Sequence, residues 1–327
     1  MNRPLLEVAH LSTTFPCGAG RMPVIDDISF SVSQGEVVAL VGESGCGKSL
    51  TALSLLRLVP KPGRIEAQSS IRLGERQLLE LSVPEMRRVR GRQIAMIFQE
   101  PMSALNPVQR VGSQVVEAIQ LHERIPLSAA RARVESLFER VGIPDPRARF
   151  DCYPHQLSGG IKQRVMIAMA VSMRPHVLIA DEPTTALDVT VQAQILELLR
   201  ELQRDLGTAI LLITHDLGVV NELADRVLVM YAGKIVERGT RLTVLRDPAH
   251  PYTRGLLRSI PARAVRGRPL EEIAGVVPSP EHWPAGCRFE PRCPQRFEPC
   301  GRDVPGATVV GPAHEACCHA VKKAMAE

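Results

Sequence analysis

The sequence has few aromatic residues and no long apolar run. Aromatic side chains make up 3% of the 327 residues, although apolar residues make up 45%. The longest apolar runs, such as Ala209–Ile213 and Val227–Tyr231, fall far short of the ~18 residues that a membrane-spanning helix needs. The first residues, Met1–Pro4, contain no apolar segment of the kind found in a signal peptide. We therefore expect a chain that neither spans a membrane nor is secreted.

Charge of one sign is not in large excess either. The formal net charge is +5, which is a weak indication of any partner, and charged residues make up an ordinary 23%. This composition excludes disorder for most of the chain. Ala, Val, Leu and Ile supply the apolar fraction, which suits helices packed on buried parallel strands. The length gives a soft expectation of two domains.

Cysteine and proline are concentrated near the C-terminus. Five of the eight cysteines lie in the last 41 residues, namely Cys287, Cys293, Cys300, Cys317 and Cys318. Proline is frequent between Pro248 and Pro312. Structural disulfides are rare in a reducing cytoplasm, so clustered cysteines there favour a metal site over a disulfide scaffold.

Periodicity predicts strands that alternate with helices. The predicted strands are several within 5–41, ending at 37–41, then 94–98, 177–180, 209–214, and a hairpin of 226–231 and 234–238 through Ala232-Gly233; the predicted helices are 48–58, 111–121, 128–141, 159–173, 189–206 and 217–223. This alternation indicates an α/β fold with a mostly parallel sheet. After about residue 245 the periodicity fades, and the prolines there predict an irregular segment without much secondary structure.

A glycine-rich loop joins the strand 37–41 to the helix that follows. Residues 42–49, Gly-Glu-Ser-Gly-Cys-Gly-Lys-Ser, fit the pattern G-x-x-x-x-G-K-[ST] between a strand and a helix. The glycines allow backbone N–H groups to surround phosphate oxygens, and the helix N-terminus adds its positive dipole. Lys48 is placed to reach the β- and γ-phosphates, and the Ser49 hydroxyl to bind Mg²⁺. Cys46 reads as a small filler of the loop rather than a ligand.

Polar residues follow three of the other buried strands. Asp181 and Glu182 end the strand 177–180, at the edge where open α/β sheets bind ligands. Asp181 is expected to hold Mg²⁺ through water, and Glu182 to activate the attacking water as general base. Gln99 is expected to coordinate Mg²⁺ or water, and His215 to hold the γ-phosphate. Each of these last two residues, taken alone, reads more simply as structural.

The string Leu157-Ser158-Gly159-Gly160, just before a helix, makes the resemblance specific. It resembles the signature motif of ATP-binding-cassette (ABC) ATPases. Gln99 is then similar to the family's Q-loop, Ala186-Leu187-Asp188 to its D-loop, and His215 to its switch histidine. Phe15 resembles the aromatic residue that stacks on adenine, although it reads almost equally well as a core residue of a strand. The resemblance covers about residues 5–260.

The resemblance implies a site and a mechanism. ATP and Mg²⁺ are the implied cofactors, with Glu182, His215 and Gln99 catalytic and Ser49, Gln99 and Asp181 on Mg²⁺. The implied ATP-binding residues are Phe15, Gly42, Glu43, Ser44, Gly45, Cys46, Gly47, Lys48, Ser49, Leu50, Gln99, Asp181, Glu182 and His215. Ser158, Gly159, Gly160, Gln163 and Asp188 would face the ATP of a partner subunit, because each site in this family pairs one phosphate loop with another subunit's signature. The signature departs from the usual pattern at Ile161, where many members carry glutamine.

Further strings resemble one branch of the family. Residues 99–107 and 250–257, together with the cysteine-bearing tail, look like the ATPase subunits of dipeptide, oligopeptide and nickel importers, and residues 164–170 and 184–190 like the D-type subunit. The implied partners are a homologous F-type ATPase, two membrane permeases and an extracytoplasmic binding protein, with no nucleic acid. The implied location is the cytoplasmic face of the bacterial inner membrane, as a peripheral subunit. Import of nickel or another small solute, and a non-transport ABC ATPase, remain as alternatives.

These expectations divide the chain into two regions. Residues 1–260 are predicted to form a P-loop ABC nucleotide-binding domain with a parallel-sheet core, antiparallel N-terminal strands and a helical subdomain at about 101–173. Residues 261–327 are predicted to form a short Cys- and Pro-rich regulatory extension. The resemblance implies a [4Fe–4S] cluster there on Cys287, Cys293, Cys300 and Cys318, with Cys317 as the alternative fourth ligand. A zinc site and free thiols are the other interpretations.

Overall fold

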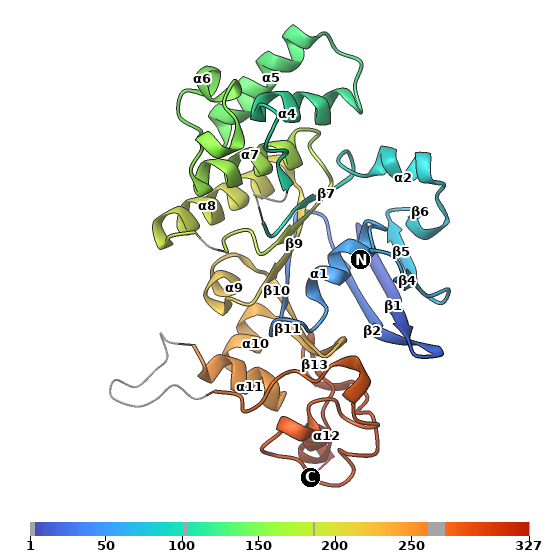
Figure 1. The fold of residues 1–327 in the computed structure, drawn as a ribbon. Coiled ribbons are helices and arrows are strands. Elements are labelled where there is room, and N and C mark those ends of the chain that lie inside the picture. The colour runs from blue at the N-terminus through green and yellow to red at the C-terminus, as the bar shows by residue number, and fades with distance from the viewer. Residues whose placement is uncertain (1–3, 101–103, 186, 261–271, 327) are drawn as a thin grey trace. The chain divides into compact units, whose positions relative to one another are not determined.

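The computed structural model describes residues 4–100, 104–185, 187–260 and 272–326 (Figure 1). The chain divides into two compact units. Unit 1 consists of the described residues of Met1–Leu6, Val32–Glu36 and Glu80–Leu212, and unit 2 of Glu7–Ser31, Val37–Leu79 and the described residues of Ile213–Glu327. The fold is α/β, which confirms the class predicted from the sequence.

The elements follow the predicted alternation closely. Unit 1 holds the greater part of α2 (Val83–Val89), β7 (Ile94–Ile97), α4 (Val111–Gln120), α5 (Leu127–Arg140), α6 (Pro146–Phe150), η2 (Pro154–Gln156), α7 (Gly159–Val171), β8 (Val177–Asp181), α8 (Val189–Leu206) and β9 (Ala209–Thr214). Unit 2 holds the greater part of β1 (Leu6–Cys17), β2 (Gly20–Val32), β3 (Val37–Val41), α1 (Lys48–Leu55), β4 (Arg64–Ile65), β5 (Ser70–Leu73), β6 (Arg76–Gln77), η1 (Leu78–Glu80), α9 (Leu217–Leu223), β10 (Arg226–Tyr231), β11 (Lys234–Thr240), α10 (Arg241–Arg246), α11 (Pro251–Arg258), η4 (Pro280–His282), η5 (Glu290–Arg292), β12 (Thr308–Gly311), β13 (His314–Ala316) and α12 (His319–Ala326).

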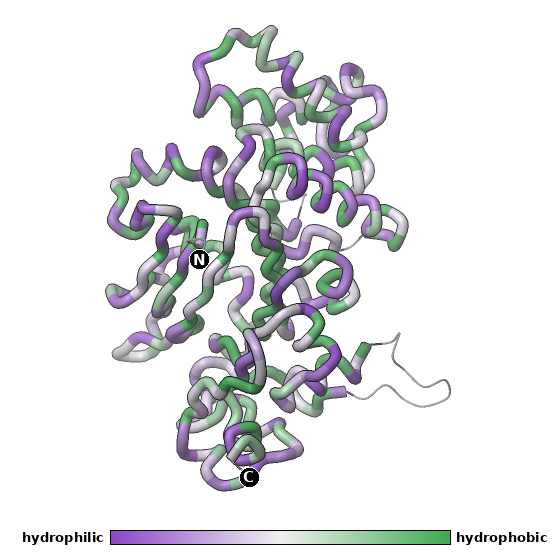
Figure 2. Tube along the Cα trace, turned by 180° about the vertical axis from the view of Figure 1, so that it is seen from behind, coloured by the Kyte–Doolittle hydropathy of each residue, from purple (hydrophilic) through white to green (hydrophobic). Residues whose placement is uncertain are grey.

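Unit 1 is built on the strand order β9-β8-β7. β7 and β8 run parallel, with Ile97 opposite Ala180, so their carboxyl ends meet at one edge. Every residue of β8 is buried, as its unbroken apolar run predicts. The helices bury one face each: in α5 the buried residues are Ala130, Val134 and Phe138, spaced four apart. In Figure 2, hydrophobic and hydrophilic residues accordingly alternate along the turns of the helices.

Unit 2 contains two sheets. The smaller has the order β2-β1-β5-β6, with β4 antiparallel to β1. In the larger, the order within the unit is β12-β13-β11-β10-β3, with β10 parallel to β3 and antiparallel to β11. Ala232 and Gly233 both have positive φ (44° and 80°), the backbone that a two-residue hairpin turn requires. The predicted β10–β11 hairpin is therefore confirmed.

The C-terminal segment is more regular than the sequence predicted. β13 pairs with β11, with Ala316 opposite Glu237, and β12 pairs with β13. Phe289 is 2% exposed and belongs to the same apolar core as Val229 and Tyr252. The expectation of a segment without much secondary structure was wrong at these positions. A free strand edge at β11 supplied pairing that short-range periodicity does not reveal.

The domain boundary predicted at about residue 260 adjoins residues 261–271, which lie outside the described residues, so it stays a prediction. Within the described ranges, no helix combines the length and the apolarity needed to cross a membrane.

Candidate functional site

The predicted phosphate loop lies in unit 2 between β3 and α1. Its glycines are required by close packing as well as by dihedral angles. A Cβ on Gly42 would lie 2.2 Å from the carbonyl oxygen of Met230. Gly47 caps α1 with φ 109°, and a Cβ there would lie 2.8 Å from Met230 Cε. Any other residue at these two positions would displace the loop from β10.

Lys48 lies inside the loop rather than in solvent. Its side chain is buried, and Nζ donates to the carbonyl oxygens of Gly42 at 2.8 Å and Glu43 at 3.0 Å. Burial raises the pKa of the neighbouring Cys46 thiol, and the Lys48 charge opposes that rise. Cys46 is 1% exposed, which supports its interpretation as a filler that keeps the loop compact. Ser44 and Gly45, at the tip, are exposed.

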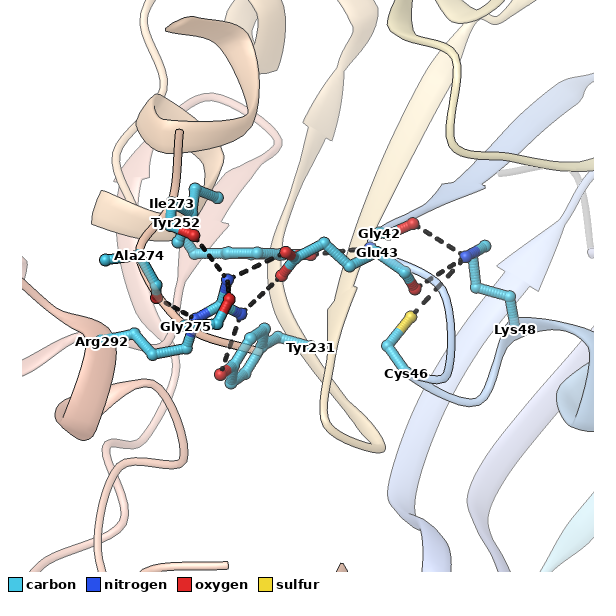
Figure 3. Close-up of polar contacts among 10 residues, drawn as sticks. All are labelled: Gly42, Glu43, Cys46, Lys48, Tyr231, Tyr252, Ile273, Ala274, Gly275 and Arg292. Atoms are coloured by element: carbon cyan, nitrogen blue, oxygen red, sulfur yellow. Dashed lines mark hydrogen bonds and ion pairs between the residues drawn. The ribbon is translucent and has the colours of Figure 1, made fainter. Parts of the chain in front are cut away.

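The loop is held from its other side by residues that sequence reasoning missed (Figure 3). Arg292 contacts both carboxylate oxygens of Glu43, at 2.7 and 2.9 Å. The Tyr252 hydroxyl accepts a hydrogen bond from the Glu43 backbone N–H at 2.8 Å. The rings of Tyr231 and Tyr252 meet edge to face, 4.6 Å between centroids. The phosphate-loop motif carries no signal for these partners, which follow it by about 190 to 250 residues in the chain.

A second group of predicted site residues lies in unit 1, at the carboxyl ends of β7 and β8. Asp181 is the last residue of β8 and is 3% exposed. Glu182 follows in the left-handed region (φ 46°), which few non-glycine residues adopt. Its carboxylate accepts from Gln99 Nε2 at 3.3 Å and from Thr185 Oγ1 at 2.8 Å. The structure thus brings Gln99 and Glu182 together, as parallel strands with a common edge would require.

The signature residues form the N-terminus of α7, also in unit 1. Ser158 is the N-cap of this helix, and its hydroxyl accepts from the N–H of Ile161 at 3.4 Å. Ser158 and Gly159 are exposed, and a Cβ on Gly160 would lie 2.9 Å from Val191. The helix therefore presents its cap and first N–H groups outward while it packs closely on α8.

Gln163 and Asp188 have structural contacts in addition to their predicted role. Gln163 is 2% exposed, and its side-chain amide donates to the Pro183 carbonyl at 2.7 Å. It ties the signature helix to the loop that carries Glu182. Asp188 caps α8 by accepting from the Val191 N–H at 2.9 Å. Ala186, which precedes it in the predicted D-loop, and residues 101–103, after the Q-loop, lie outside the described residues.

Phe15 and His215 also lie in unit 2, as do Ser49 and Leu50, which are partly buried in the first turn of α1. Phe15 is half-buried in β1, and its ring leaves no room for a side chain at Gly63, whose Cβ would approach to 2.5 Å. His215 directly follows β9 and is exposed. The next residue, Asp216, caps α9 by accepting a hydrogen bond from the Gly218 N–H at 2.7 Å. Phe15, the phosphate loop and His215 thus belong to unit 2, whereas Gln99, Asp181, Glu182 and the signature residues belong to unit 1.

None of the tail cysteines, all of which are among the described residues, forms a disulfide, and their thiols influence one another. Burial raises the pKa of the Cys287 thiol to about 11, and the thiols of Cys318, Cys300 and Cys293 add to the rise. Burial likewise raises the pKa of Cys293, with contributions from Cys318 and Cys300. The backbone N–H of Cys287 donates to the carbonyl of Cys300 at 2.8 Å. Among the described residues, no three or more His, Cys, Asp or Glu side chains are arranged to hold a metal ion.

Comparison with known proteins agrees with both the fold and the motifs. The ABC transporter family matches residues 25–185, and the family described as oligopeptide/dipeptide transporter, C-terminal region, matches residues 236–300. The solved ATP-binding cassette MJ0796, a dimer bound to ADP and phosphate, is 24% identical with a TM-score of 0.63 over 72% of this chain and 98% of that one. CbiO1 of Clostridium perfringens, part of an ABC transporter complex, is 30% identical with a TM-score of 0.62 over 75% of this chain and 91% of that one.

Curated relatives match along almost the whole chain. The dipeptide transport ATP-binding protein DppD of Haemophilus influenzae is 49% identical over 96% of this chain and 95% of its own length. The oligopeptide transport ATP-binding protein AppD of Bacillus subtilis is 48% identical over 92% of each. Identity of this extent, on the cassette fold and with both groups of motifs in place, leaves one conclusion. The chain belongs to the ABC transporter family, as an ATP-hydrolysing ATP-binding subunit of its dipeptide and oligopeptide transporter branch.

Proposed function

We propose that this chain powers the import of dipeptides or oligopeptides through a membrane ABC transporter. The observation that carries the proposal is the match of residues 236–300 to the C-terminal region of oligopeptide/dipeptide transporters, a segment outside the ATPase motifs. The relatives named for dipeptide and oligopeptide transport support it. The chain would act as a peripheral subunit on the cytoplasmic face of the inner membrane, with residues 1–260 as the ATPase domain and 261–327 as a regulatory extension.

The ATPase roles proposed for individual residues follow from their chemistry. Backbone N–H groups of residues 42–50 and Lys48 would bind the phosphates, with Phe15 against the adenine. Ser49, Asp181 and Gln99 would hold Mg²⁺, whose hard charge prefers hydroxyl, carboxylate and amide oxygens. Glu182 would take a proton from the attacking water, and His215 would contact the γ-phosphate. The exposed Ser158 cap would meet the ATP of a partner subunit, because a helix N-terminus favours an anion.

The proposed assembly contains a second, homologous F-type ATPase, two membrane permeases and an extracytoplasmic binding protein, and no nucleic acid. Two ATP molecules would close the head-to-tail ATPase pair, and hydrolysis would release it. The segment after Gln99 would contact the permeases. Import of nickel is the second candidate, since substrate choice in such systems lies in the binding protein and permeases.

The test is a reconstituted complex of this chain with the proposed permeases, binding protein and second ATPase. ATP hydrolysis in proteoliposomes would be measured with the binding protein loaded with a dipeptide, a pentapeptide or Ni²⁺. Peptide-stimulated hydrolysis and peptide uptake are expected, and a complex carrying Glu182→Gln in this chain serves as the control. Stimulation by Ni²⁺ with no response to either peptide would replace peptide import by nickel import.

We further propose that the tail holds a [4Fe–4S] cluster on Cys287, Cys293, Cys300 and Cys318. The backbone contact between Cys287 and Cys300, 2.8 Å from N–H to carbonyl oxygen, supports this ligand set, as do the effects of Cys318, Cys300 and Cys293 on the pKa of Cys287. The four thiolates of such a cluster bind four different irons, so they need not converge on one point as the ligands of a zinc ion must. Cys317 has different surroundings: burial raises the pKa of its thiol, and Arg238, Glu315 and Lys234 act on that pKa more strongly than Cys318 does. Cys318 is therefore the better fourth ligand.

Iron and acid-labile sulfide in anaerobically purified protein test the cluster. We expect about four irons per chain by the stoichiometry of a [4Fe–4S] centre, lost in Cys318→Ser and retained in the matched variant Cys317→Ser. A colourless sample that contains zinc and no iron would contradict the proposal. So would a sample with neither metal, which would favour free thiols.

A further inference from the structure

The strongest unexplained contact in unit 2 joins the C-terminal segment to the phosphate loop (Figure 3). The Arg292 guanidinium faces the Glu43 carboxylate with both terminal nitrogens, Nη1 on Oε2 at 2.7 Å and Nη2 on Oε1 at 2.9 Å. The Arg292 side chain is 5% exposed, whereas that of Glu43 is 29% exposed. A planar pair of this kind, with one partner buried, fixes the position and direction of the carboxylate.

Arg292 is also held in place by hydrogen bonds to backbone carbonyl groups. Its Nε donates to the Ala274 carbonyl at 2.8 Å, and Nη2 donates to the carbonyls of Ile273 at 3.1 Å and Gly275 at 3.2 Å. Burial by itself would lower the pKa of Arg292, but the Glu43 carboxylate holds it above its usual range. The guanidinium is therefore a rigid, fully charged group rather than a mobile surface cation.

Glu43 is anchored at three different atoms. Arg292 holds the side chain, the Tyr252 hydroxyl accepts from the backbone N–H at 2.8 Å, and Lys48 Nζ donates to the backbone carbonyl at 3.0 Å. Tyr252 is fully buried and packs on Phe289, 5.4 Å between ring centroids. The second residue of the phosphate loop is thus fixed by Arg292 of the C-terminal segment, by Tyr252 of α11 and by Lys48 of the loop itself.

The negative charge of Glu43 makes its ion pair with Arg292 relevant to ATP binding. A carboxylate in a loop that binds a triphosphate repels the ligand unless a cation compensates it, and the repulsion is strong where water is partly excluded. Arg292 supplies that compensation while it leaves Lys48 directed into the loop. We propose that Arg292 is a positioning residue for ATP binding: it neutralises and orients Glu43, and through it the C-terminal segment sets the affinity of the phosphate loop for nucleotide.

The proposal makes a prediction that a purely structural contact does not. Arg292→Met, which keeps an unbranched apolar side chain but removes the guanidinium, should raise the dissociation constant of MgATP about tenfold, equivalent to about 1.4 kcal/mol. Glu43→Gln added to Arg292→Met should recover most of that loss, because it removes the uncompensated charge. The loss should also be larger for ATP than for ADP, since ATP carries one more negative charge at the phosphates.

The experiment uses the full-length chain and equilibrium dialysis with labelled MgATP and MgADP. The variants are Arg292→Met, Arg292→Lys, Glu43→Gln and Arg292→Met/Glu43→Gln, with melting temperature and circular dichroism as checks of folding. Arg302→Gln is the matched control, because it removes an ion pair of the same segment, with Glu298 at 2.8 Å, that lies on the surface. We expect it to leave both dissociation constants unchanged.

Two results would overturn the proposal. One is a folded Arg292→Met or Arg292→Lys variant that binds MgATP as tightly as the unaltered chain. The other concerns the two backgrounds in which Arg292→Met is introduced. If it lowers the affinity for MgATP equally in the Glu43→Gln chain and in the unaltered chain, Arg292 acts by supporting the segment and not through Glu43. If Arg292→Met does not fold, Arg292→Lys carries the test, with an expected loss of about threefold because a single donor nitrogen and the positive charge remain.

Discussion

At the scale of single residues, Glu182 is the position where local structure and proposed chemistry coincide. Its left-handed backbone is unfavourable for glutamate and is maintained by the contacts of its carboxylate with Gln99 and Thr185. We expect Glu182→Gln to lower hydrolysis by about 100-fold or more while MgATP binding persists, because the amide cannot accept the proton from water. Phosphate release and nucleotide titration measure the two quantities. Glu201→Gln, an exposed change on α8, is the control, and undiminished hydrolysis in Glu182→Gln would reject the assignment of the base.

A second residue-scale prediction concerns acid sensitivity. His250 is fully buried at the start of α11, and its Nδ1 accepts from the Tyr252 N–H at 3.1 Å. Burial, helped by the charge of Arg254, lowers the pKa of His250 to about 3, although the Cys317 backbone opposes the shift. The unfolded chain therefore binds a proton below about pH 6.5 that the folded chain does not, so stability falls as the pH falls through the window from about 6.5 to 3.

The measurement compares the unaltered chain with His250→Asn, which keeps a side-chain acceptor for the helix N-terminus. On going from pH 7 to pH 5, the unaltered chain should lose about 2 kcal/mol more free energy of unfolding than the variant. Urea denaturation at both pH values gives the difference. Equal losses would show that another group dominates the acid response.

At the scale of elements, Glu237 of β11 connects three parts of unit 2. Its carboxylate is 1% exposed and accepts from the backbone N–H groups of Ala249 at 2.7 Å and His250 at 2.9 Å, and from His314 Nε2 at 2.7 Å. The start of α11 and the β12–β13 hairpin are thereby fixed to the same strand. A buried carboxylate that satisfies three donors leaves all three unpaired when it is removed.

We accordingly expect Glu237→Ala to reduce the free energy of unfolding by about 3–5 kcal/mol, and Glu237→Gln by less. Glu315→Ala on β13 is the control, since its ion pair with Arg238 at 3.3 Å is partly exposed and should contribute about 0–1 kcal/mol. Urea denaturation followed by circular dichroism measures all three. Similar losses for Glu237→Ala and Glu315→Ala would show that the buried network is not what joins the elements.

At the scale of the whole molecule, the C-terminal segment completes the core of unit 2. Phe289 packs edge to face on Tyr231, 5.2 Å between centroids, and Trp283, Cys287 and Cys293 pack against the same apolar core. Ending the chain at residue 260 would expose this face. Since loss of a single buried phenylalanine costs about 3–5 kcal/mol, we expect the truncated chain to melt much lower or to aggregate. Calorimetry of the truncated chain beside Phe289→Ala tests this, and a truncated chain as stable as the full one would contradict it.

Much of the fold could be predicted because its signals are local. The helix at Val189–Leu206 and the strand at Ala209–Thr214 were predicted with the bounds that the structure has, because a single buried face or a continuous apolar run encodes each. The loop 42–49 was recognisable because its glycines, lysine and serine lie within a few consecutive residues of the sequence. The β12–β13 hairpin was missed because its pairing with β11 joins residues almost 80 positions apart.

The sequence by itself therefore determined the order of the elements, the phosphate loop, the strand-end carboxylates and the family. Each depends on residues that lie close together along the chain, where periodicity and spacing act directly. The tertiary structure decided which distant residues surround those motifs: Arg292 and Tyr252 on Glu43, Gln163 on Pro183, and Phe289 in the core. Long-range contacts of this kind follow from how buried surfaces and unpaired polar groups find partners in three dimensions, and no spacing in the sequence encodes them.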